Sequence, residues 1–512
     1  MVAADEPSSD AAGLREVSAP SAGHAVWMVA RRELIDQLTS MRFLAIALLV
    51  VGLTPLAVYV GARDYINRLQ DFSRLSAERQ ALASGPAGKA IKGYDDPWTP
   101  ENDLLVLRVL RPPEPMSALV RGLDGALPQY WDFSSAGHSE GPPATRPRRL
   151  IDALGQMDLE FLIRVVLGLL AVLLAFDAVA GEKESGTLRM ALSQPISRSA
   201  FLAGKLVGGV ISITVPLVAA FLTGLISGQL FGLDLLKNSD LARVGLLAIT
   251  ASIYLWGFYS LGLLVSSSFG SQKTTLVVLL VVWVCSVLAL PPVSTLLARA
   301  VVPVAATQTV EARKRALSDD LQRECETTLG RVYNQVTGQP EDAVNSGPYY
   351  KNKTAVDSKI GPILLEYLNR RRRNLDGLDR DADRRATRQN TVANGIMILS
   401  PAAAFANAAA NLAGTGDTCR VSWAAVIQRH ETELNSLLFE NPPMITFRSR
   451  VGSTTIPRRT PPSLAGLPTF AAPRSDAATA INGALPSLGL LGLYAGLFTV
   501  IAFVAFSRYD VR

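Results

Sequence analysis

The longest apolar segments of the chain are three runs without a charged residue, at positions 206–231, 244–270 and 274–298. Each run exceeds the roughly 20 residues that a helix needs to cross a bilayer. Two further apolar stretches lie near the ends of the chain, at 43–62 and around 487–506. The pattern predicts transmembrane helices at 43–62, 161–180, 206–231, 244–266, 274–298 and 487–507.

The span at 161–180 is the weakest of the six, because it contains Arg164 and Asp177. It still crosses the membrane if Arg164 extends its guanidinium to one interface and Asp177 lies at the other. Only helices and closed barrels satisfy their backbone groups in lipid. The sequence therefore predicts an all-α polytopic membrane protein with six transmembrane helices.

Two long polar inserts interrupt the spans, at 63–158 and 300–485. The first continues the preceding helix, becomes rich in Pro and Gly after Gly85, and has one candidate strand at 104–110. The second has the pattern of helices at 305–337, 359–374, 381–399 and 423–439, with an irregular section after them. We expect the second insert to be mainly α-helical with some irregular or β structure.

The N-terminal residues differ from a secretory signal. Residues 1–23 are rich in Ala, Ser and acidic groups without an apolar core, which predicts a disordered tail. Residues 24–42 place Trp27, Leu34 and Leu38 at helical spacing, with charged residues between them. This pattern predicts an amphipathic helix along the membrane surface, and an ordinary juxtamembrane linker is the alternative.

Composition and charge support the membrane assignment and orient the chain. Of 512 residues, 49% are hydrophobic and only 18% are charged, below the roughly 25% of soluble domains. Lys and Arg gather before the first span, between the second and third, and after the sixth. The positive-inside rule then places both termini in the cytoplasm and both inserts outside.

Three cysteines bear on the compartment of the inserts. Cys285 lies within the fifth span, where a small buried side chain suits it. Cys325 and Cys419 both lie in the second insert, which is outside the cytoplasm in this topology. The sequence predicts a disulfide between these two, and two unrelated thiols are the alternative.

Known catalytic motifs are missing from the sequence. There is no phosphate-binding loop, no dinucleotide fingerprint, and the only histidines, His24, His138 and His430, are far apart. The four arginines at 370–373 are followed at once by acidic residues, which is typical of a solvated helix rather than of a nucleic-acid site. We expect neither a catalytic centre nor a cofactor, metal or nucleic acid on this chain.

Two other segments allow two interpretations each. The Ala-rich segment 400–418 predicts either a helix packed on the membrane surface or a partner copy, or an ordinary helix capped by Gly414. The polar segment 181–199 predicts a short helix that begins at Ser185, ends at Pro195 and exposes Thr187, Leu188, Met190 and Leu192, or else a solvated loop. Such an exposed helix suits a groove on a soluble partner.

The segment 176–209, FDAVAGEKESGTLRMALSQPISRSAFLAGKLVGG, resembles the signature of ABC type-2 exporter permeases, the membrane subunits of split ABC transporters. Their pattern is an acidic residue, then E-x-E-x-GTL-x-x-x-LS-x-P-x-SR, then GK at the start of the next span. The segment SPAAAF…AGTGD at 400–417 resembles the subgroup with a large extracytoplasmic domain between spans five and six. The matching signature residues are Glu182, Glu184, Gly186, Thr187, Leu188, Ser193, Pro195, Ser197, Arg198, Gly204 and Lys205.

The resemblance implies a division of labour between chains. A separate cytoplasmic ABC ATPase, carrying ATP and Mg²⁺, docks on the coupling segment at 181–203 and on an elbow helix at 24–42. A second permease copy, identical or related, completes the path across a bacterial inner membrane. The coupling role then lies with Glu182, Glu184, Gly186, Thr187 and Leu188, and with Arg32 and Glu33 of the elbow helix.

The alternative is a membrane-anchored scaffold whose two inserts recruit periplasmic or outer-envelope partners without translocation. The length of the inserts favours it, and both roles are compatible in one molecule. An ion channel or proton-driven carrier fits poorly, because the spans lack the interior charges of such pathways. The sequence does not identify the substrate. It also does not decide whether the protein exports a substrate or performs mechanical work, or whether the permease is a homodimer or a heterodimer.

Overall fold

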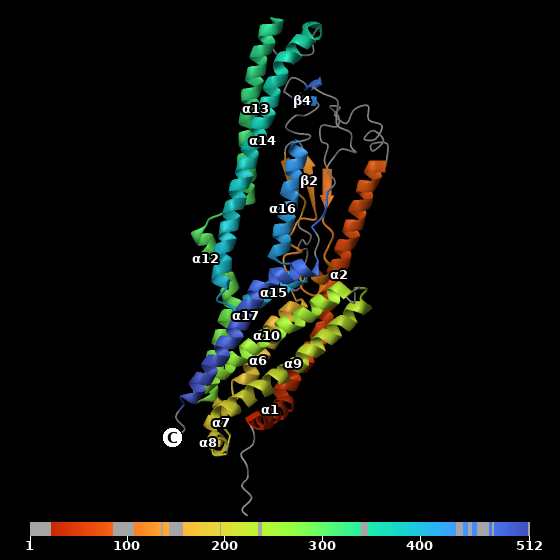
Figure 1. The fold of residues 1–512 in the computed structure, drawn as a ribbon. Coiled ribbons are helices and arrows are strands. Elements are labelled where there is room, and N and C mark those ends of the chain that lie inside the picture. The colour runs from red at the N-terminus through yellow and green to blue at the C-terminus, as the bar shows by residue number, and fades with distance from the viewer. Residues whose placement is uncertain are drawn as a thin grey trace, which may run out of the picture.

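The computed structural model of the chain is a long molecule in which helices dominate (Figure 1). It describes residues 22–84, 107–134, 137–142, 157–194, 196–233, 238–338, 347–436, 444–448, 453–457, 470–473 and 476–509. The predicted tail at 1–23 lies almost wholly outside these ranges. Within them, six helices are long and apolar enough to cross a membrane, which confirms the predicted number of spans.

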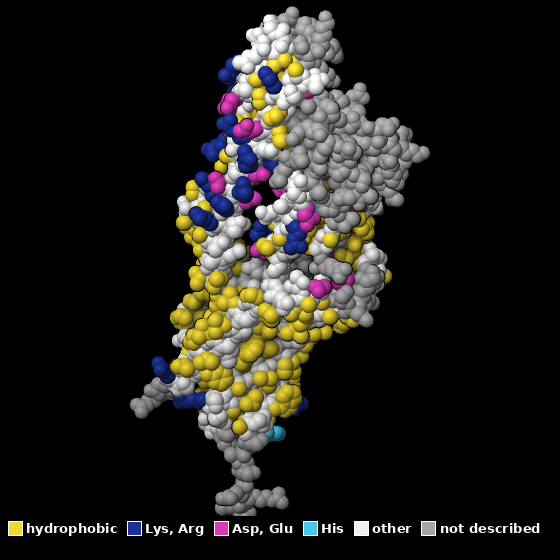
Figure 2. All heavy atoms as spheres, turned by 45° about the horizontal axis from the view of Figure 1, so that its top comes forward, with side chains coloured by type: hydrophobic (Ala, Val, Ile, Leu, Met, Phe, Trp, Pro, Cys, Tyr) yellow, Lys and Arg dark blue, Asp and Glu magenta, His cyan; other side chains and the backbone are white. Residues whose placement is uncertain are grey.

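Among the described residues, the six spans are built from ten helical pieces. Four spans are single helices, and the second and fifth contain π-helical turns, where one extra residue is inserted into the helix. The pieces are α2 (Met41–Ser84), α5 (Leu159–Phe161), η3 (Leu162–Leu167), α6 (Gly168–Ala175), α9 (Arg198–Leu230), α10 (Asn238–Ser268), α11 (Gln272–Val284), η4 (Cys285–Ala289), α12 (Leu290–Val301) and α17 (Ala477–Ser507). Hydrophobic side chains form a broad belt over this bundle (Figure 2).

Three short helices gather at one end of the bundle, which also holds the last turn of α17 (Figure 1). They are α1 (Ala22–Leu38), α7 (Ala180–Glu184) and α8 (Thr187–Leu192). We call this end the α7 end. The helix α2 extends well beyond the apolar belt at the other end, as the sequence predicted for the start of the first insert.

The opposite end carries a small folded region built from both inserts. An antiparallel sheet in the order β1 (Leu107–Leu110), β2 (Tyr130–Ser134), β3 (Gly137–Glu140) packs against α16 (Asp417–Leu434). The rings of Trp131 and Trp423 stack there at 5.3 Å. A short 3₁₀ helix, η2 (Pro115–Ala118), and a hairpin of β4 (Met444–Arg448) and β5 (Ser453–Pro457) complete it. The predicted strand at 104–110 is present over its described part.

A helical hairpin projects from this end, formed by α13 (Thr307–Thr337) and α14 (Gly347–Met397). The helix α14 has 51 residues, about 75 Å at 1.5 Å per residue. The two separate helices predicted at 359–374 and 381–399 are therefore wrong. Gly377 between them disfavours a helix by only about 1 kcal/mol, and the apolar stripe continues across the gap through the buried Leu375.

The predicted disulfide is not formed. Cys325 lies in the core of the hairpin, together with Leu329 and Leu364. Cys419 packs beside the tryptophan pair of the sheet region instead, in a separate hydrophobic cluster. Both cysteines lie in the second insert, but each side chain packs in a different hydrophobic cluster, so the two sulfurs do not meet.

The Ala-rich segment forms α15 (Pro401–Leu412), which lies inside the bundle rather than on a surface. Ten of its residues are buried, and it packs against α17 and α10. The Ser400 hydroxyl accepts a hydrogen bond from the amide of Ala403 at its start, and Gly414 adopts φ +72° just after its end. Small side chains allow this close approach, and the Gly414 cap agrees with the second predicted interpretation.

Candidate functional site

The polar segment between the second and third spans is two short helices, α7 and α8, joined at Gly186. Gly186 has φ +73°, a left-handed conformation in which glycine has no Cβ penalty. The predicted helix start at Ser185 is wrong, because Ser185 closes α7: its hydroxyl donates to the carbonyl of Gly181 at 2.8 Å. The same hydroxyl lies 2.8 Å from that of Thr187, so the turn is held from both sides.

The helix α8 has one buried and one exposed face. Leu188 is only 2% exposed and belongs to the main hydrophobic core, whereas Met190 is 71% exposed. The prediction that Leu188 is exposed is therefore wrong, because a helix of six residues keeps its place only by burying a side chain in the bundle. Its outward surface is formed by Thr187, Arg189, Met190, Ser193 and Gln194.

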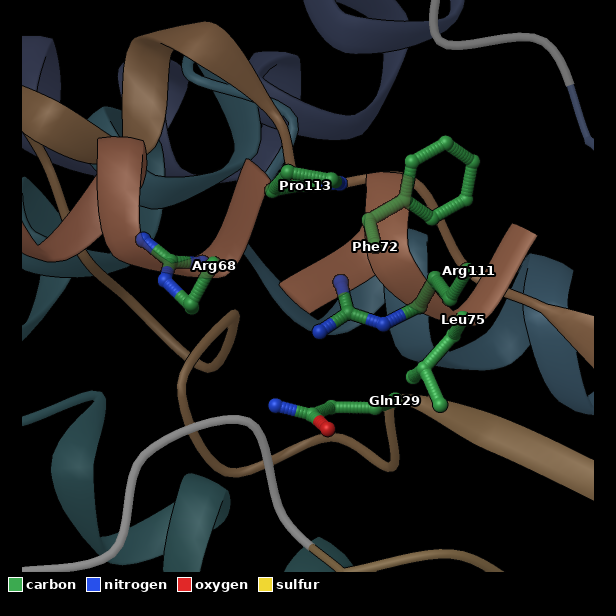
Figure 3. A pocket seen from close by; sticks show the side chains of 6 residues that line it. All are labelled: Arg68, Phe72, Leu75, Arg111, Pro113 and Gln129. Atoms are coloured by element: carbon green, nitrogen blue, oxygen red, sulfur yellow. The ribbon is translucent and has the colours of Figure 1, made fainter. Parts of the chain in front are cut away.

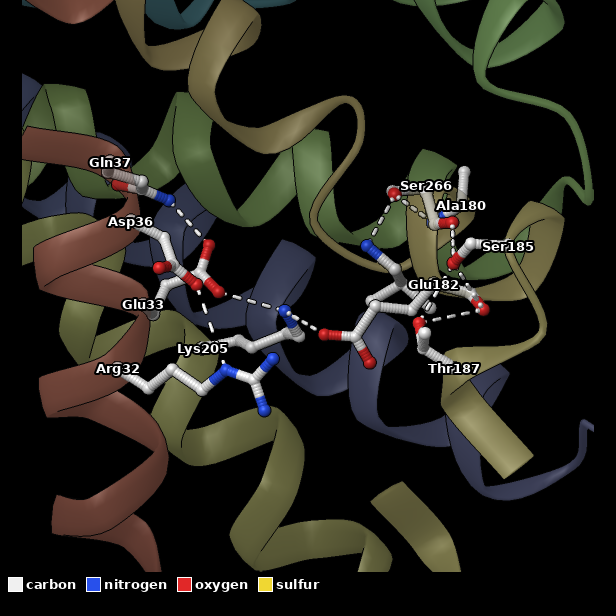
Figure 4. A network of polar contacts seen from close by, with 12 residues as sticks. Arg32, Glu33, Asp36, Gln37, Ala180, Glu182, Ser185, Thr187, Lys205 and Ser266 are labelled. Carbon is white, nitrogen blue, oxygen red and sulfur yellow. Dashed lines mark hydrogen bonds and ion pairs between the residues drawn. The ribbon is translucent and has the colours of Figure 1, made fainter. Parts of the chain in front are cut away.

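A buried lysine joins this segment to two other helices (Figure 4). The ammonium of Lys205, near the start of α9, lies 2.8 Å from Glu33 of α1 and 2.8 Å from Glu182 of α7. The lysine side chain is only 5% exposed. Removing a charge from water is costly unless it is paired, and here two carboxylates share one cation. The arrangement ties α1, α7 and α9 together.

The carboxylate of Glu33 is held from its other side as well. Gln37 donates from Nε2 to Glu33 at 2.6 Å and to the hydroxyl of Tyr259 at 3.1 Å. Tyr259, on α10, in turn donates to the backbone carbonyl of Lys205 at 3.3 Å. The network therefore reaches from α1 through α9 to α10.

The remaining charges of α7 bind the ends of neighbouring spans. Glu184 accepts a hydrogen bond from the amide of Gln272, at the N-terminus of α11, over 2.9 Å. Lys183 donates to the carbonyls of Ser267 and Phe269, at the C-terminus of α10. Carboxylates are stabilised at helix N-termini and cations at C-termini, so each charge matches the dipole of the helix that it meets.

The break between α6 and α7 is also closed by a side chain. The hydroxyl of Ser266, on α10, accepts from the amides of Val179 and Ala180 at 3.1 and 2.9 Å, and donates to the carbonyl of Phe176 at 2.9 Å. These backbone groups are left over where one helix ends and the next begins. The chain therefore bends sharply here without losing hydrogen bonds.

Glycines on α9 allow its two neighbours to approach. A Cβ on Gly204 would lie 2.5 Å from the Cβ of Val29, and one on Gly208 would lie 2.7 Å from the carbonyl oxygen of Ala30, both on α1. A Cβ on Gly209 would meet the ring of Tyr259 at 1.9 Å. The GK and GG pairs at the start of the third span thus set the distance between α9, α1 and α10.

The structure separates the residues expected to form the site into two groups. Glu33 and Glu182 meet at Lys205, and Glu184 reaches α11, whereas Arg32 stays 84% exposed and forms an ion pair with Asp36 at 3.8 Å. Sequence reasoning matched Lys205 to the motif but did not assign it a role. A lysine next to a long apolar run is the signal that indicates a buried, paired charge. Lys183, Ser266, Gln272, Gln37 and Tyr259 gave no such signal.

A second polar cluster lies at the opposite end of the molecule. A pocket of about 20 Å³ at the opposite end has room for about one water (Figure 3). Two of its side chains, Arg68 and Arg111, both bind the buried carboxylate of Asp124. Within the part of the chain that the structure describes, no cluster of His, Cys, Asp or Glu is suited to a metal. The pocket is lined by Arg68, Phe72, Leu75, Arg111, Pro113 and Gln129.

Comparison with known proteins supplies the family. A family model described as ABC-2 family transporter protein matches residues 27–511, almost the entire chain. The probable ABC transporter permease protein NosY of Stutzerimonas stutzeri is 28% identical to the chain over 124 residues. That stretch is 23% of this chain and 44% of the relative, so the chain covers less than half of the relative's length.

Proposed function

The chain belongs to the ABC-2 family of transporter proteins, and on that premise we propose that it is the permease subunit of an exporter-type ATP-driven transporter. Its ATPase is a separate cytoplasmic chain that carries ATP and Mg²⁺. That chain docks on α7, α8 and the neighbouring α1, the elbow helix. The observation that carries the proposal is the pairing of Lys205 with Glu33 and Glu182, which links these helices.

The contacts of α7 and α8 support this proposal, because they offer a route by which docking at a small surface would move the spans. The exposed face of α8 around Met190 is available to a partner, while Leu188 anchors the same helix in the core. Displacement of α7 acts on α9 through Glu182, on α10 through Lys183 and on α11 through Glu184. A displacement of α7 by the ATPase would therefore be transmitted to three spans through charged contacts at their ends.

The assembly that we propose contains a second permease copy, identical or related, in a bacterial inner membrane. Both termini lie in the cytoplasm and both inserts lie outside. Lys and Arg between spans two and three support this orientation, because positively charged short segments stay in the cytoplasm.

Purification of the tagged chain from its host in mild detergent tests the proposal. We expect an ATPase with a phosphate-binding loop to co-purify in stoichiometric amount, and the variant Glu184→Arg to lose it. Reversing this charge places a cation at the N-terminus of α11 and on the docking surface. The matched control is Glu311→Arg, on the projecting hairpin, which keeps the ATPase.

Loss of the ATPase in both variants, or in neither, contradicts the assigned docking surface. Recovery of a periplasmic or outer-envelope protein without any ATPase favours a scaffold that recruits partners without translocation. The observation that supports this second function is the long hairpin of α13 and α14.

A further inference from the structure

The last residue of α17, Ser507, and Tyr509 just after it are bound to the α7 end by two basic side chains of the coupling segment, Arg198 and Lys183. Arg198, the first residue of α9, donates from Nη1 to the carbonyls of Ser507 at 3.2 Å and Tyr509 at 2.9 Å. Lys183 of α7 lies with its ammonium 3.9 Å from the centre of the Tyr509 ring. The chain beyond the sixth span therefore returns to the segment between the second and third.

The contact with Tyr509 is placed where α7 meets α10. The same ammonium of Lys183 donates to the carbonyls of Ser267 and Phe269 at the end of α10. A cation over an aromatic face is attracted by the negative charge density of the ring. The Lys183 ammonium therefore contacts both the ring of Tyr509 and the end of α10. Lys183 lies between Glu182 and Glu184 in the sequence.

An independent contact holds the end of α17 against α9. The ring of Phe506 stacks on that of Phe201 with centroids 5.8 Å apart, and Lys205 lies 5.4 Å over the Phe201 ring. Tyr509 is half-buried and packs against the same hydrophobic core. The final turn of the last span therefore contacts the buried Lys205 indirectly, through the ring of Phe201.

We propose that Tyr509 is a positioning residue of the coupling segment: its ring holds Lys183, and through Lys183 it fixes α7 and α8 for docking of the ATPase. This inference rests on the proposed function. The inference adds the sixth span to those that α7 contacts, and it includes Tyr509, which follows that span, in the site. The residue touches neither ATP nor substrate, and it acts only through Lys183.

The test compares Tyr509→Leu with Tyr509→Phe in the full-length chain. Leucine keeps the apolar bulk and removes the aromatic face, whereas phenylalanine keeps the face and removes only the hydroxyl. Hydrogen exchange of the purified chain alone should rise over residues 181–194 in the leucine variant. The change expected is about two- to five-fold, the range of a cation–π contact at a half-exposed site. The phenylalanine variant should match the wild type.

The same variants are then scored for the co-purified ATPase, with Tyr494→Leu as the control. Tyr494 lies within α17, whereas Tyr509 follows the end of that helix, and the Tyr494 hydroxyl donates to the carbonyl of Ile398. We expect Tyr509→Leu to recover less ATPase, and Tyr509→Phe and Tyr494→Leu to recover it fully. In the background Lys183→Met, replacing Tyr509 should have no further effect, because the contact is already lost.

Either of two results overturns the proposal: wild-type exchange and ATPase recovery in Tyr509→Leu, or equal damage in Tyr509→Phe. Failure of the proposed function is distinguishable, since it means that no ATPase co-purifies with the wild type or that Glu184→Arg keeps it. Hydrogen exchange of the isolated chain still reports whether Tyr509 orders the segment in that case.

Discussion

At the scale of single residues, the buried cation of Lys205 is the centre of the site. Its ammonium is paired with Glu33 and Glu182, and its side chain is only 5% exposed to solvent. A buried ion pair is weak evidence for stability by itself, but removing one partner leaves the other charge buried and uncompensated. The fold should therefore be sensitive to the loss of this lysine.

Replacing Lys205 by methionine should destabilise the protein by about 3–5 kcal/mol, because two carboxylates lose their shared cation. Unfolding in a denaturing detergent measures this. The control Lys314→Met removes a lysine that also has two carboxylate partners, Glu311 and Asp379, but these two are 48% and 44% exposed and the lysine itself 22%. It should cost about 1 kcal/mol or less. Adding Glu33→Gln and Glu182→Gln to Lys205→Met should restore most of the loss, and no restoration would contradict the pairing.

His430 makes the sheet region sensitive to pH. Its ring lies edge-on to Phe133 at 5.3 Å and to Phe470 at 5.2 Å, and burial lowers its pKa below the ordinary 6.5, with Glu433 acting in the opposite direction. The unfolded chain therefore takes up the proton first as the pH falls. The stabilising contribution is complete above pH 6.5 and is lost as the pH drops through the lower folded pKa.

We expect the melting temperature of the wild type to fall more between pH 7.5 and pH 5.5 than that of His430→Phe. The phenylalanine keeps an aromatic ring between Phe133 and Phe470 but cannot take up a proton. All other titrating groups are common to both proteins, so the difference between the two curves isolates His430. Parallel curves would show that the imidazole stays accessible to protons in the folded state.

At the scale of elements, α9 is a helix with two glycine-lined contacts. Gly204 and Gly208 admit α1, and Gly209 admits the ring of Tyr259 from α10. Close approach is what allows the short side chain of Glu33 to reach Lys205, since α1 would otherwise lie further from α9. Packing of small residues is the main source of affinity between helices in a membrane, where the hydrophobic effect does not act.

The variant Gly208→Ala should weaken the contact between α1 and α9, because the added methyl group would lie 2.7 Å from the Ala30 carbonyl oxygen. Overpacking of this kind costs about 1–3 kcal/mol. Gly245→Ala on α10 is the matched control, since nothing lies within 4 Å of its Cβ. Removing a helical glycine there should stabilise by roughly 0.5–1 kcal/mol. Equal stability of the two variants would argue against a close α1–α9 contact.

At the scale of the whole molecule, the two ends of the bundle differ in composition. The α7 end is small and gathers the charged network, whereas the opposite end carries the sheet region and the hairpin, on which charged side chains of both signs are exposed (Figure 2). The hairpin has its own core around Leu329 and Leu364, separate from that of the bundle. The base of the hairpin joins the bundle, where α12 packs against α14.

The proposed orientation is tested with single cysteines at the two ends, in a background where Cys285, Cys325 and Cys419 are replaced. Ala316→Cys on α13 should react with an impermeant maleimide in intact cells, because it is exposed on the outer hairpin. Met190→Cys on α8 should react only after the membrane is opened. The reverse pattern would invert the topology.

The sequence alone determined the membrane class, the six spans and the family resemblance. Length and absence of charge are local properties, and lipid forces such runs to be helices. Helix breaks were less certain, as the uninterrupted α14 demonstrates, because a weak breaker such as Gly377 is overruled when the apolar stripe continues on both sides.

Only the tertiary structure decided which charges meet. Glu33 and Lys205 are 172 positions apart, and Arg198 and Tyr509 are 311 apart, so no spacing rule connects them. Likewise the structure, not the pattern, placed Cys325 and Cys419 in different clusters and buried Leu188 and α15. The pattern of polar and apolar residues can be read along the chain. The partner of a side chain, however, depends on how whole helices pack, and that packing depends on close contacts such as those of Gly204 and Gly208.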